Sequence, residues 1–407
     1  MYLGLIELQH FRNYARLELT LEPRYHLLCG RNAQGKTNLL EAIYFLVTTK
    51  SPLALSDREV IAWDAASEPI PYARLRGVFH RAEATVELEA TLMLEEAQDP
   101  DKSPRLQKQL RVNGVPRRAM DVLGQANAVL FMPQDIELVG GPPSVRRRYL
   151  DSTLCQVDSA YCRALSQFNH TVTQRNALLK RIRERESRPD ELSYWDQQLV
   201  GLGARILARR QEAVVELNGY AAAAHAELTA SGEALALAYA ASLAERDTES
   251  RGDSPLEATD ADEIAARWRR LLPSLRREEI ARGITVVGPH RDDLRFTVGG
   301  WDAAAYGSRG QQRTAALALK TAEMRLITRV AGERPILLLD DVASELDSAR
   351  CQQLLAVMDA ADQVLVTTTR LTALPQALRD RAATWRVEKG TVTPYTAPEE
   401  APASAPS

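Results

Sequence analysis

The chain has 407 residues, more than a single domain usually needs, which predicts two domains or lobes. Its 51 Lys and Arg against 54 Asp and Glu give a net charge of −3, so contact with nucleic acid or acidic lipid requires local basic patches. The four cysteines are scattered without a CxxC pair and indicate neither a zinc site nor a disulfide framework. With no signal peptide and no apolar segment of membrane-spanning length, the sequence predicts a soluble cytoplasmic protein.

The first part of the chain is typical of β-strands. "LGLIEL" and "ARLELTL" alternate apolar and polar residues, which predicts two half-buried strands, and residues 72–94 are also strand-like. The pair Asn113-Gly114 separates two further strand-like pieces and indicates a two-residue hairpin. "RYHLLCG" and "ANAVLFMP" are short apolar runs that predict buried strands.

A complete phosphate-binding loop follows the strand "RYHLLCG". The segment "GRNAQGKT" fits the pattern GxxxxGK[ST], with an apolar strand before it and a helix after it. Its backbone N–H groups converge on phosphates, Lys36 reaches the β- and γ-phosphates, and the Thr37 hydroxyl ligates magnesium. The predicted binding residues are Gly30, Arg31, Asn32, Ala33, Gln34, Gly35, Lys36 and Thr37.

The middle of the chain changes character at about Pro143. Helical periodicity dominates from 143 to 282, and the alanine-rich stretch 221–241 is predicted to be helix as well. An acidic segment at 244–263 is expected to be loose. This region predicts an all-helical insertion.

A second anion-binding feature lies near the end of the chain, in "YGSRGQQRTAALALK" at 306–320. Small residues, Ser308 and Gly310, and the donors of Gln311 stand where a helix opens, and a helix start offers unpaired N–H groups and the positive end of its dipole. The chain therefore carries two anion-binding features, far apart in sequence.

The apolar strand "PILLLDD" supplies the acids that a phosphate-binding loop requires. Asp340 stands at the carboxyl end of this strand, where it is placed to hold Mg²⁺. Asp341 is placed to orient or deprotonate the attacking water. "QVLVTTT" is a further buried strand, and 396–407 has the composition of a disordered tail.

The ordered set of motifs resembles the ABC-type ATPase heads of the SMC class and, within that class, the RecF family of bacterial recombination mediators. The resemblance spans roughly residues 1–390. It is carried by "MYLGLIELQHFRNY", "GRNAQGKTNLLEAIYFL", "QDIELVGGPPSVRRRYLD", "GPHRDDL", "SRGQQRTAALALKTAE" and "LLLDDVASELDSAR".

The expected fold is α/β, an ABC-type P-loop ATPase head with mixed β-sheets (lobe I) plus an all-helical insertion (lobe II). Lobe I is discontinuous, at 1–142 and 283–395, lobe II spans 143–282, and the tail is 396–407.

The resemblance implies roles for residues outside the two core motifs. Ser308, Gly310 and Gln311 are implied to contact the ATP of the opposite subunit, so that two heads close around two ATPs. Asp347 in "SELD" is implied to face the partner subunit, Gln134 to sense the γ-phosphate, and Arg12 to touch the nucleotide. Asp341 stands where transporter ATPases usually have Glu, and its shorter reach indicates slow hydrolysis.

DNA contact requires clustered Lys and Arg that bind backbone phosphates. One candidate is the run Arg146, Arg147 and Arg148, which the GPP turn positions, and the hairpin basics and the run near 180–183 are others. Each cluster is also compatible with a solvated charged face, and "KRIRERES" interleaves Glu with Arg as ion pairs on a helix surface do. For Arg146–Arg148, partner contact and lobe packing are open alternatives.

By resemblance, the protein is an ATP-driven, weak DNA-dependent ATPase that dimerises at single-/double-strand DNA junctions and helps RecO and RecR load RecA. Three alternatives are less favoured. A transporter's energising subunit lacks this N-terminus, an SMC-type tether needs hundreds of heptad residues, and a nuclease ATPase needs a further domain after "LLLDD".

Overall fold

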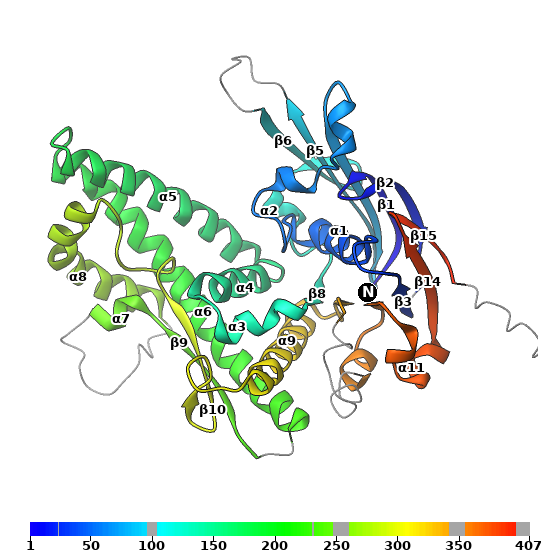
Figure 1. Cartoon of the computed structure of the whole chain (residues 1–407). Helices are drawn as coiled ribbons and strands as arrows, with labels where there is room; N and C mark the ends of the chain where they lie inside the picture. The colour runs from blue at the N-terminus through cyan, green and yellow to red at the C-terminus, as the bar shows by residue number, and fades with distance from the viewer. Residues whose placement is uncertain (23, 96–103, 230–231, 247–259, 342–354, 396–407) are drawn as a thin grey trace, which may run out of the picture. The chain divides into compact units, whose positions relative to one another are not determined.

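The computed structural model describes residues 1–22, 24–95, 104–229, 232–246, 260–341 and 355–395. The chain divides into two compact units (Figure 1). Unit 1 comprises Met1–Arg117, Ala128–Pro133 and Pro335–Ser407, and unit 2 comprises Arg118–Asn127 and Gln134–Arg334. The mixed α/β fold with several sheets and a helical region confirms the predicted fold class.

An antiparallel six-stranded sheet forms one layer of unit 1, in the order β2-β1-β4-β5-β6-β7. Its strands are β1 (Tyr2–Phe11), β2 (Tyr14–Thr20), β4 (Tyr72–His80), β5 (Thr85–Glu95), β6 (Arg105–Val112) and β7 (Val115–Arg117). Buried and half-buried residues alternate along all of β4, because successive side chains of a strand point to opposite faces. Asn113 and Gly114 join β6 to β7 with φ of 51° and 75°, which confirms the predicted hairpin turn.

A second six-stranded sheet of unit 1 has the order β15-β14-β3-β13-β12-β8. Its strands are β3 (Tyr25–Cys29), β8 (Ala128–Phe131), β12 (Ile336–Leu339), β13 (Val364–Thr368), β14 (Ala382–Glu388) and β15 (Thr391–Pro394). All neighbours from β14 to β8 are parallel, and β15 pairs antiparallel at the edge. The carboxyl ends of β3 and β12 therefore lie at the same edge of the sheet.

Helix α1 (Lys36–Thr48) packs between the two sheets of unit 1. It contacts β1, β4 and β5 of the antiparallel sheet and β8 and β13 of the parallel one. All its residues except Thr37 and Asn38 are buried. The apolar run "LLEAIYFLV" thus gives the helix its two-sided burial, and the start of α1 is fixed at the edge where β3 ends. Further short elements of unit 1 within the described residues are η1 (Asp57–Val60), η2 (Asp64–Ser67), η7 (Leu371–Ala373) and α11 (Gln376–Arg381).

Unit 2 is built around the 37-residue helix α6 (Leu192–Leu228), which contacts α5, α8, α9 and β9 (Figure 1). The other helices are α2 (Ala119–Val122), α3 (Glu137–Gly140), α4 (Pro143–Cys155), α5 (Ser159–Arg183), α7 (Ser242–Arg246), α8 (Ala261–Arg282) and α9 (Arg309–Ala331), with the short turns η3 (Pro133–Ile136) and η4 (Pro189–Glu191). A small antiparallel sheet has the order β11-β10-β9, with β9 (Leu235–Ala240), β10 (Asp293–Val298) and β11 (Trp301–Asp302). None of the described helices is both long enough and apolar enough to cross a membrane.

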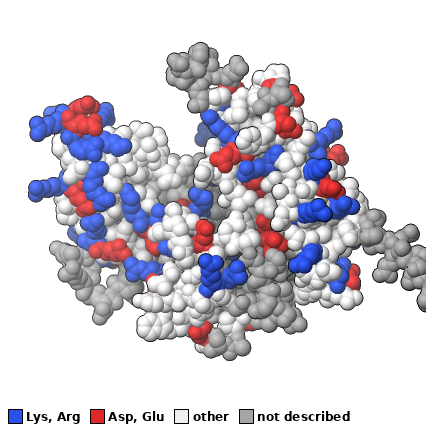
Figure 2. All heavy atoms as spheres, in the orientation of Figure 1, with Lys and Arg blue, Asp and Glu red and all other residues white. Residues whose placement is uncertain are grey.

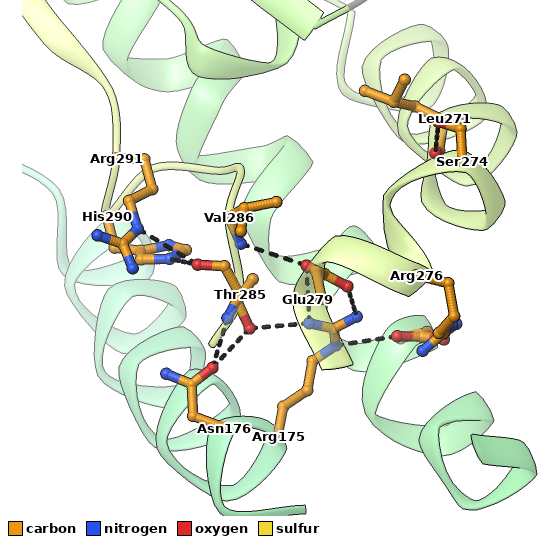
Figure 3. A network of polar contacts seen from close by, with 11 residues as sticks. Arg175, Asn176, Leu271, Ser274, Arg276, Glu279, Thr285, Val286, His290 and Arg291 are labelled. Carbon is orange, nitrogen blue, oxygen red and sulfur yellow. Dashed lines mark hydrogen bonds and ion pairs between the residues drawn. The ribbon is translucent and has the colours of Figure 1, made fainter. Parts of the chain in front are cut away.

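A buried polar network joins three helices of unit 2 (Figure 3). Arg175 of α5 donates two hydrogen bonds to Glu279 of α8, at 3.0 and 2.5 Å, and a third to Asp196 of α6 at 2.9 Å. Both side chains of the Arg175–Glu279 pair are fully buried. Arg175 also donates to the Thr285 hydroxyl, so the network holds the segment after α8 against the helices.

The structure differs from the predicted division in two respects. Residues 283–334, which we expected in lobe I, lie in unit 2, because α9 packs along α6 and β10 pairs with β9. The insertion is also not all-helical, and the predicted helix over 221–241 ends at Leu228. The alternation "LALAYA" forms β9 instead, since its pairing with β10 outweighs the helix propensity of alanine.

Candidate functional site

The phosphate-binding loop of unit 1 requires glycine at both ends for different reasons. A Cβ atom on Gly30 would lie 2.2 Å from the carbonyl oxygen of Val387. Gly35 has a φ of 114°, and its Cβ would lie 2.8 Å from the Asn13 side chain. Both positions therefore exclude other residues, because an added Cβ would collide with its neighbours at each position and the backbone at Gly35 is left-handed.

Two turns of unit 1 hold the loop from outside. Asn13 and Tyr14, at the turn from β1 to β2, donate hydrogen bonds to the carbonyl oxygens of Gln34 and Gly35, both at 2.9 Å. The backbone N–H of Lys389, in the turn after β14, donates to the Gln34 side chain at 2.8 Å. The quoted segment "FRNY" contains the first two of these residues, but their hydrogen bonds to the loop were not predicted.

The amine of Lys36 lies inside the loop. Its Nζ donates to the carbonyl oxygens of Gly30 and Arg31, at 2.7 and 2.8 Å. Burial lowers the pKa of Lys36, and the charges of Asp341 and Asp340 oppose that shift. The Lys36 amine is therefore held inside the loop by two backbone carbonyl groups.

Asp340 and Thr37 meet at the start of α1. The Thr37 hydroxyl is 2.9 Å from both carboxylate oxygens of Asp340, which directly follows β12. Burial raises the pKa of Asp340, and the hydrogen bonds from Thr367 and Thr37 oppose that rise. A hydroxyl and a carboxylate at one point form an oxygen donor pair of the kind that Mg²⁺ binds together with phosphate and water.

Thr367 connects the two aspartates, which sequence reasoning missed. Its hydroxyl donates to Asp340 at 2.7 Å and accepts from the backbone N–H of Asp341 at 2.8 Å. Asp341 has a φ of 48°, an uncommon backbone conformation for a residue other than glycine. Thr367 lies in β13, the neighbour of β12, so the adjacency of two apolar strands with polar ends is the signal that predicts this contact.

Arg12 is held by acceptors of unit 1. It donates to both carboxylate oxygens of Glu41, at 2.9 and 2.6 Å, and to the carbonyl oxygen of Glu59 at 2.9 Å. Glu41 lies on α1 and is fully buried, so this ion pair fixes the β1–β2 turn against the helix that follows the phosphate loop. A nucleotide contact by Arg12 stays a prediction.

We call Ser308, Gly310 and Gln311 the signature. These residues lie in unit 2, at the start of α9. Ser308 is the N-cap, its Oγ accepts from the Gln311 N–H at 3.2 Å, and the Gln311 side chain accepts from the Ser308 N–H at 2.9 Å. This reciprocal pair is a capping box. Ser308 is exposed and Gly310 half-buried. Ser308 therefore lies at an exposed helix start, and anion binding there stays a prediction.

The roles of two further residues stay predictions. Gln134 lies in the turn η3, three residues after β8 ends. Asp347 lies outside the described residues.

The three arginines proposed for DNA differ in their surroundings. Arg146 is buried, and its guanidinium donates to Asp293 at 2.6 and 2.8 Å and to the carbonyl oxygen of Gly141 at 2.6 Å. Arg147 donates to the carbonyl oxygen of Asp292 at 2.8 Å, whereas Arg148 is exposed. Arg146 thus joins α4 to β10, because a buried arginine needs a paired carboxylate, and of the three only Arg148 is fully exposed.

Each of the other basic clusters contains a residue that is paired with an acid. Lys108 of the hairpin pairs with Asp57 at 2.8 Å, and Arg183 pairs with Glu184 at 3.3 Å. On the face that Figure 2 shows, Lys and Arg side chains over α5 and α8 are interleaved with Asp and Glu. This supports the interpretation of those helix faces as solvated charged surfaces.

The phosphate loop between β3 and α1, the acid after β12 and the separate capped helix define a P-loop ATPase head of the ABC and SMC type. A family model, the RecF/RecN/SMC N terminal domain, matches residues 2–393. The chain belongs to the RecF family of DNA replication and repair proteins within that class.

Curated relatives match over nearly the whole chain. The chain is 44% identical to the DNA replication and repair protein RecF of Chloroflexus aurantiacus, over 96% of this chain and 99% of that protein. It is 43% identical to that of Roseiflexus castenholzii, over 97% of this chain and 100% of that protein.

Solved structures agree with this assignment. A structure of the recombination mediator protein RecF with ATP, described as part of the RecFOR pathway, is similar with a TM-score of 0.83 and 31% identity, over 97% of this chain and 98% of that one. An Smc head, at a TM-score of 0.52 and 15% identity over 98% of each chain, is similar in fold.

Proposed function

We propose that this chain is an ATP-dependent DNA-binding switch of recombinational repair and replication restart. Two copies close around two ATPs while bound at single-/double-strand junctions, such as those of gapped DNA, and slow hydrolysis releases them. The support is the similarity to ATP-bound RecF proteins, together with the separation of the chain's two anion-binding features.

One observation supports pairing more than any other. The phosphate loop of unit 1 has its own lysine, hydroxyl and acid, whereas the start of α9 has an exposed Ser308 and helix N–H groups with no phosphate loop attached. A helix terminus of this kind supplies donors that complete a phosphate site but do not form one alone. The loop and the signature are therefore two parts of one site that is assembled from two copies.

Within this proposal the residues of unit 1 bind ATP. The loop Gly30–Thr37 holds the phosphates, and the charged Lys36 amine contacts their terminal oxygens. Thr37 and Asp340 would hold Mg²⁺, which neutralises charge on the phosphates when bound, and their hydroxyl and carboxylate oxygens fit that ion. Thr367 keeps the Asp340 carboxylate oriented toward Thr37.

Hydrolysis depends on Asp341 in this proposal. Its backbone is fixed by Thr367, and its carboxylate orients or deprotonates the water that attacks the γ-phosphate. The short side chain keeps turnover slow, which suits a switch. An Asp341→Asn variant should bind ATP and dimerise yet hydrolyse at a strongly reduced rate, measured by phosphate release. Undiminished turnover would remove Asp341 from this role.

DNA and two protein partners complete the proposal. The protein acts in the cytoplasm and, with RecO and RecR, helps load RecA onto gapped DNA. The description of similar structures as part of the RecFOR pathway supports this assignment.

The direct test of the function is DNA binding with and without ATP. We would measure affinity for gapped, single-stranded and duplex DNA over a salt series, because the salt slope reports how many phosphates are contacted. The expected result is ATP-enhanced binding with a preference for the gapped substrate. Equal affinity for all three substrates, unaffected by ATP, would contradict the proposal.

A further inference from the structure

The start of α9 has an acidic neighbour that belongs to no motif. Glu233, in the segment before β9, accepts hydrogen bonds from the side-chain Nε2 of Gln311 at 3.1 Å to each carboxylate oxygen. Gln311 is the residue that closes the capping box with Ser308. A chain of hydrogen bonds therefore runs from Glu233 through Gln311 to Ser308.

This series of hydrogen bonds sets the orientation of the Gln311 side-chain amide. Its two ends are chemically different, since Nε2 donates and Oε1 accepts. A carboxylate accepts only, so Glu233 fixes Nε2 on its own side and leaves Oε1 for the Ser308 N–H, 2.9 Å away. With the amide turned over, a carboxylate would face a carbonyl oxygen, and the Ser308 N–H would lose its acceptor.

The same arrangement defines which donors remain for an anion. The Gln311 N–H is used by Ser308 Oγ, and the Gln312 N–H by the Ser308 carbonyl. Because Ser308 Oγ accepts in this box, its own hydrogen is available to donate. The Ser308 hydroxyl and the backbone N–H groups of Arg309 and Gly310 are therefore the donors that remain for an anion at the start of α9.

We propose that Glu233 is a positioning residue for the signature, and that it orders Ser308 for the γ-phosphate of the opposite copy's ATP by orienting Gln311. This inference rests on the proposed pairing. Glu233 itself lies beside the β10–β11 turn, where the Gly299 N–H donates to the Ala234 carbonyl at 2.9 Å. The turn thus provides a fixed support, outside α9, for the signature side chains.

The test compares three variants of the full-length protein. Glu233→Ala removes the acceptor, Glu233→Gln keeps one acceptor oxygen, and Glu227→Ala is the matched control. Glu227 is also an acid that pairs with α9, through Arg325 at 3.0 Å, but it lies far along the helix from Ser308. The measurements are ATP affinity of the monomer by a fluorescent analogue, and the dimer dissociation constant with ATP by sedimentation.

We expect Glu233→Ala to weaken the ATP-bound dimer by about tenfold, by analogy with the loss of a helix cap at each of two sites. ATP affinity of the monomer should stay at the wild-type value. Glu233→Gln should recover most of the loss, and Glu227→Ala should match the wild type. Adding Glu233→Ala to Gln311→Ala should cause no further loss, because both changes remove one chain of contacts.

The outcomes separate the inference from the function on which it rests. If the wild type dimerises with ATP and Glu233→Ala dimerises equally well, the positioning role is wrong and the proposed function stands. Equal losses in Glu233→Ala and Glu227→Ala would also overturn the role, since the effect would then be general to α9. A wild type that stays monomeric with ATP would remove the proposed function.

Discussion

Single hydroxyls and rings decide much of the chemistry at the residue scale. Thr367 shows this most clearly, since one oxygen orients the Asp340 carboxylate and fixes the backbone of Asp341. Three threonines in a row end "VLVTTT", and the letters alone do not say which of them contacts Asp340. Strand register decides it, because Val366 pairs with Leu339 and the next residues of the two strands are Thr367 and Asp340.

The first prediction concerns the Thr367 hydroxyl. Thr367→Val keeps the shape but removes the hydroxyl that accepts from the Asp341 N–H and donates to the Asp340 carboxylate, so we expect the ATP hydrolysis rate to fall by about tenfold or more. Thr368→Val is the matched control, because the Thr368 hydroxyl is also buried in β13 but bonds to the Arg370 carbonyl at 3.0 Å. A similar fall in both variants would show that the effect is one of stability rather than of orientation.

The second prediction concerns His290, which lies in the segment "GPHRDDL". Its Nε2 donates to the Thr285 carbonyl at 3.2 Å, and burial lowers its pKa to about 4 (Figure 3). Because the folded-state pKa lies below the unfolded value, the unfolded chain binds the extra proton first as pH falls from about 6.5 to about 4. Stability should therefore decrease through that window.

The measurement is urea unfolding of the wild type and His290→Gln, which keeps a donor near the same place. Between pH 7 and pH 5 the wild type should lose about 2 kcal/mol of unfolding free energy more than the variant. Equal losses in the two proteins would show that His290 titrates normally.

At the scale of elements, a buried polar network fixes two helices of unit 2 and the segment that follows α8. The Arg175–Glu279 pair joins α5 to α8 and holds Thr285, five residues before His290 (Figure 3). Neither residue stands out in the sequence, since arginine and glutamate are frequent on helix surfaces. Only the packing of the helices shows that Glu279 is buried and Glu278 is half-buried.

The third prediction uses that pair as its own control. Glu279→Gln removes the negative charge that pairs with the buried Arg175, so it should lower the unfolding free energy by about 3 kcal/mol. Glu278→Gln alters a half-buried residue whose ion pairs with Arg246 and Arg282 lie at the surface, and should leave stability nearly unchanged. Thermal unfolding of both variants checks this, and equal midpoints would contradict a structural role for the network.

The elements of the head follow from local patterns, and those of unit 2 follow less well. The hairpin at Asn113-Gly114, the loop Gly30–Thr37 and the strand before Asp340 were predicted because turn chemistry and apolar runs are local signals. Strand β9 was missed, because six residues rich in alanine favour a helix until β10, over 50 residues later, pairs with them. For Arg146, the sequence left DNA contact, partner contact and lobe packing open for the same reason, since Asp293 is distant in sequence.

At the scale of the whole molecule, the chain folds as two compact units that carry different parts of the proposed site. The phosphate loop and its acids belong to unit 1, and Ser308 with Gln311 and Glu233 belongs to unit 2. The sequence motifs alone indicate both parts of the site, but the prediction that two copies of the chain pair came only from the resemblance to a family.

The fourth prediction separates the two parts by mutation. Lys36→Met removes the cation of the phosphate loop and should abolish nucleotide binding together with ATP-driven dimerisation. Ser308→Arg places a bulky side chain at the start of α9 and should abolish dimerisation while nucleotide binding is kept. Nucleotide binding by a fluorescent analogue distinguishes the two variants, and loss of binding in Ser308→Arg would contradict the assignment of the signature to the opposite copy.

The central claim is that ATP joins two copies of the chain, and molar mass in solution tests it most directly. Light scattering of the wild type on gapped DNA should give the mass of the DNA with one copy of the chain in the absence of nucleotide. With ATP and Mg²⁺ it should give the mass of the DNA with two copies. A protein that stays monomeric with ATP on that DNA would contradict the account.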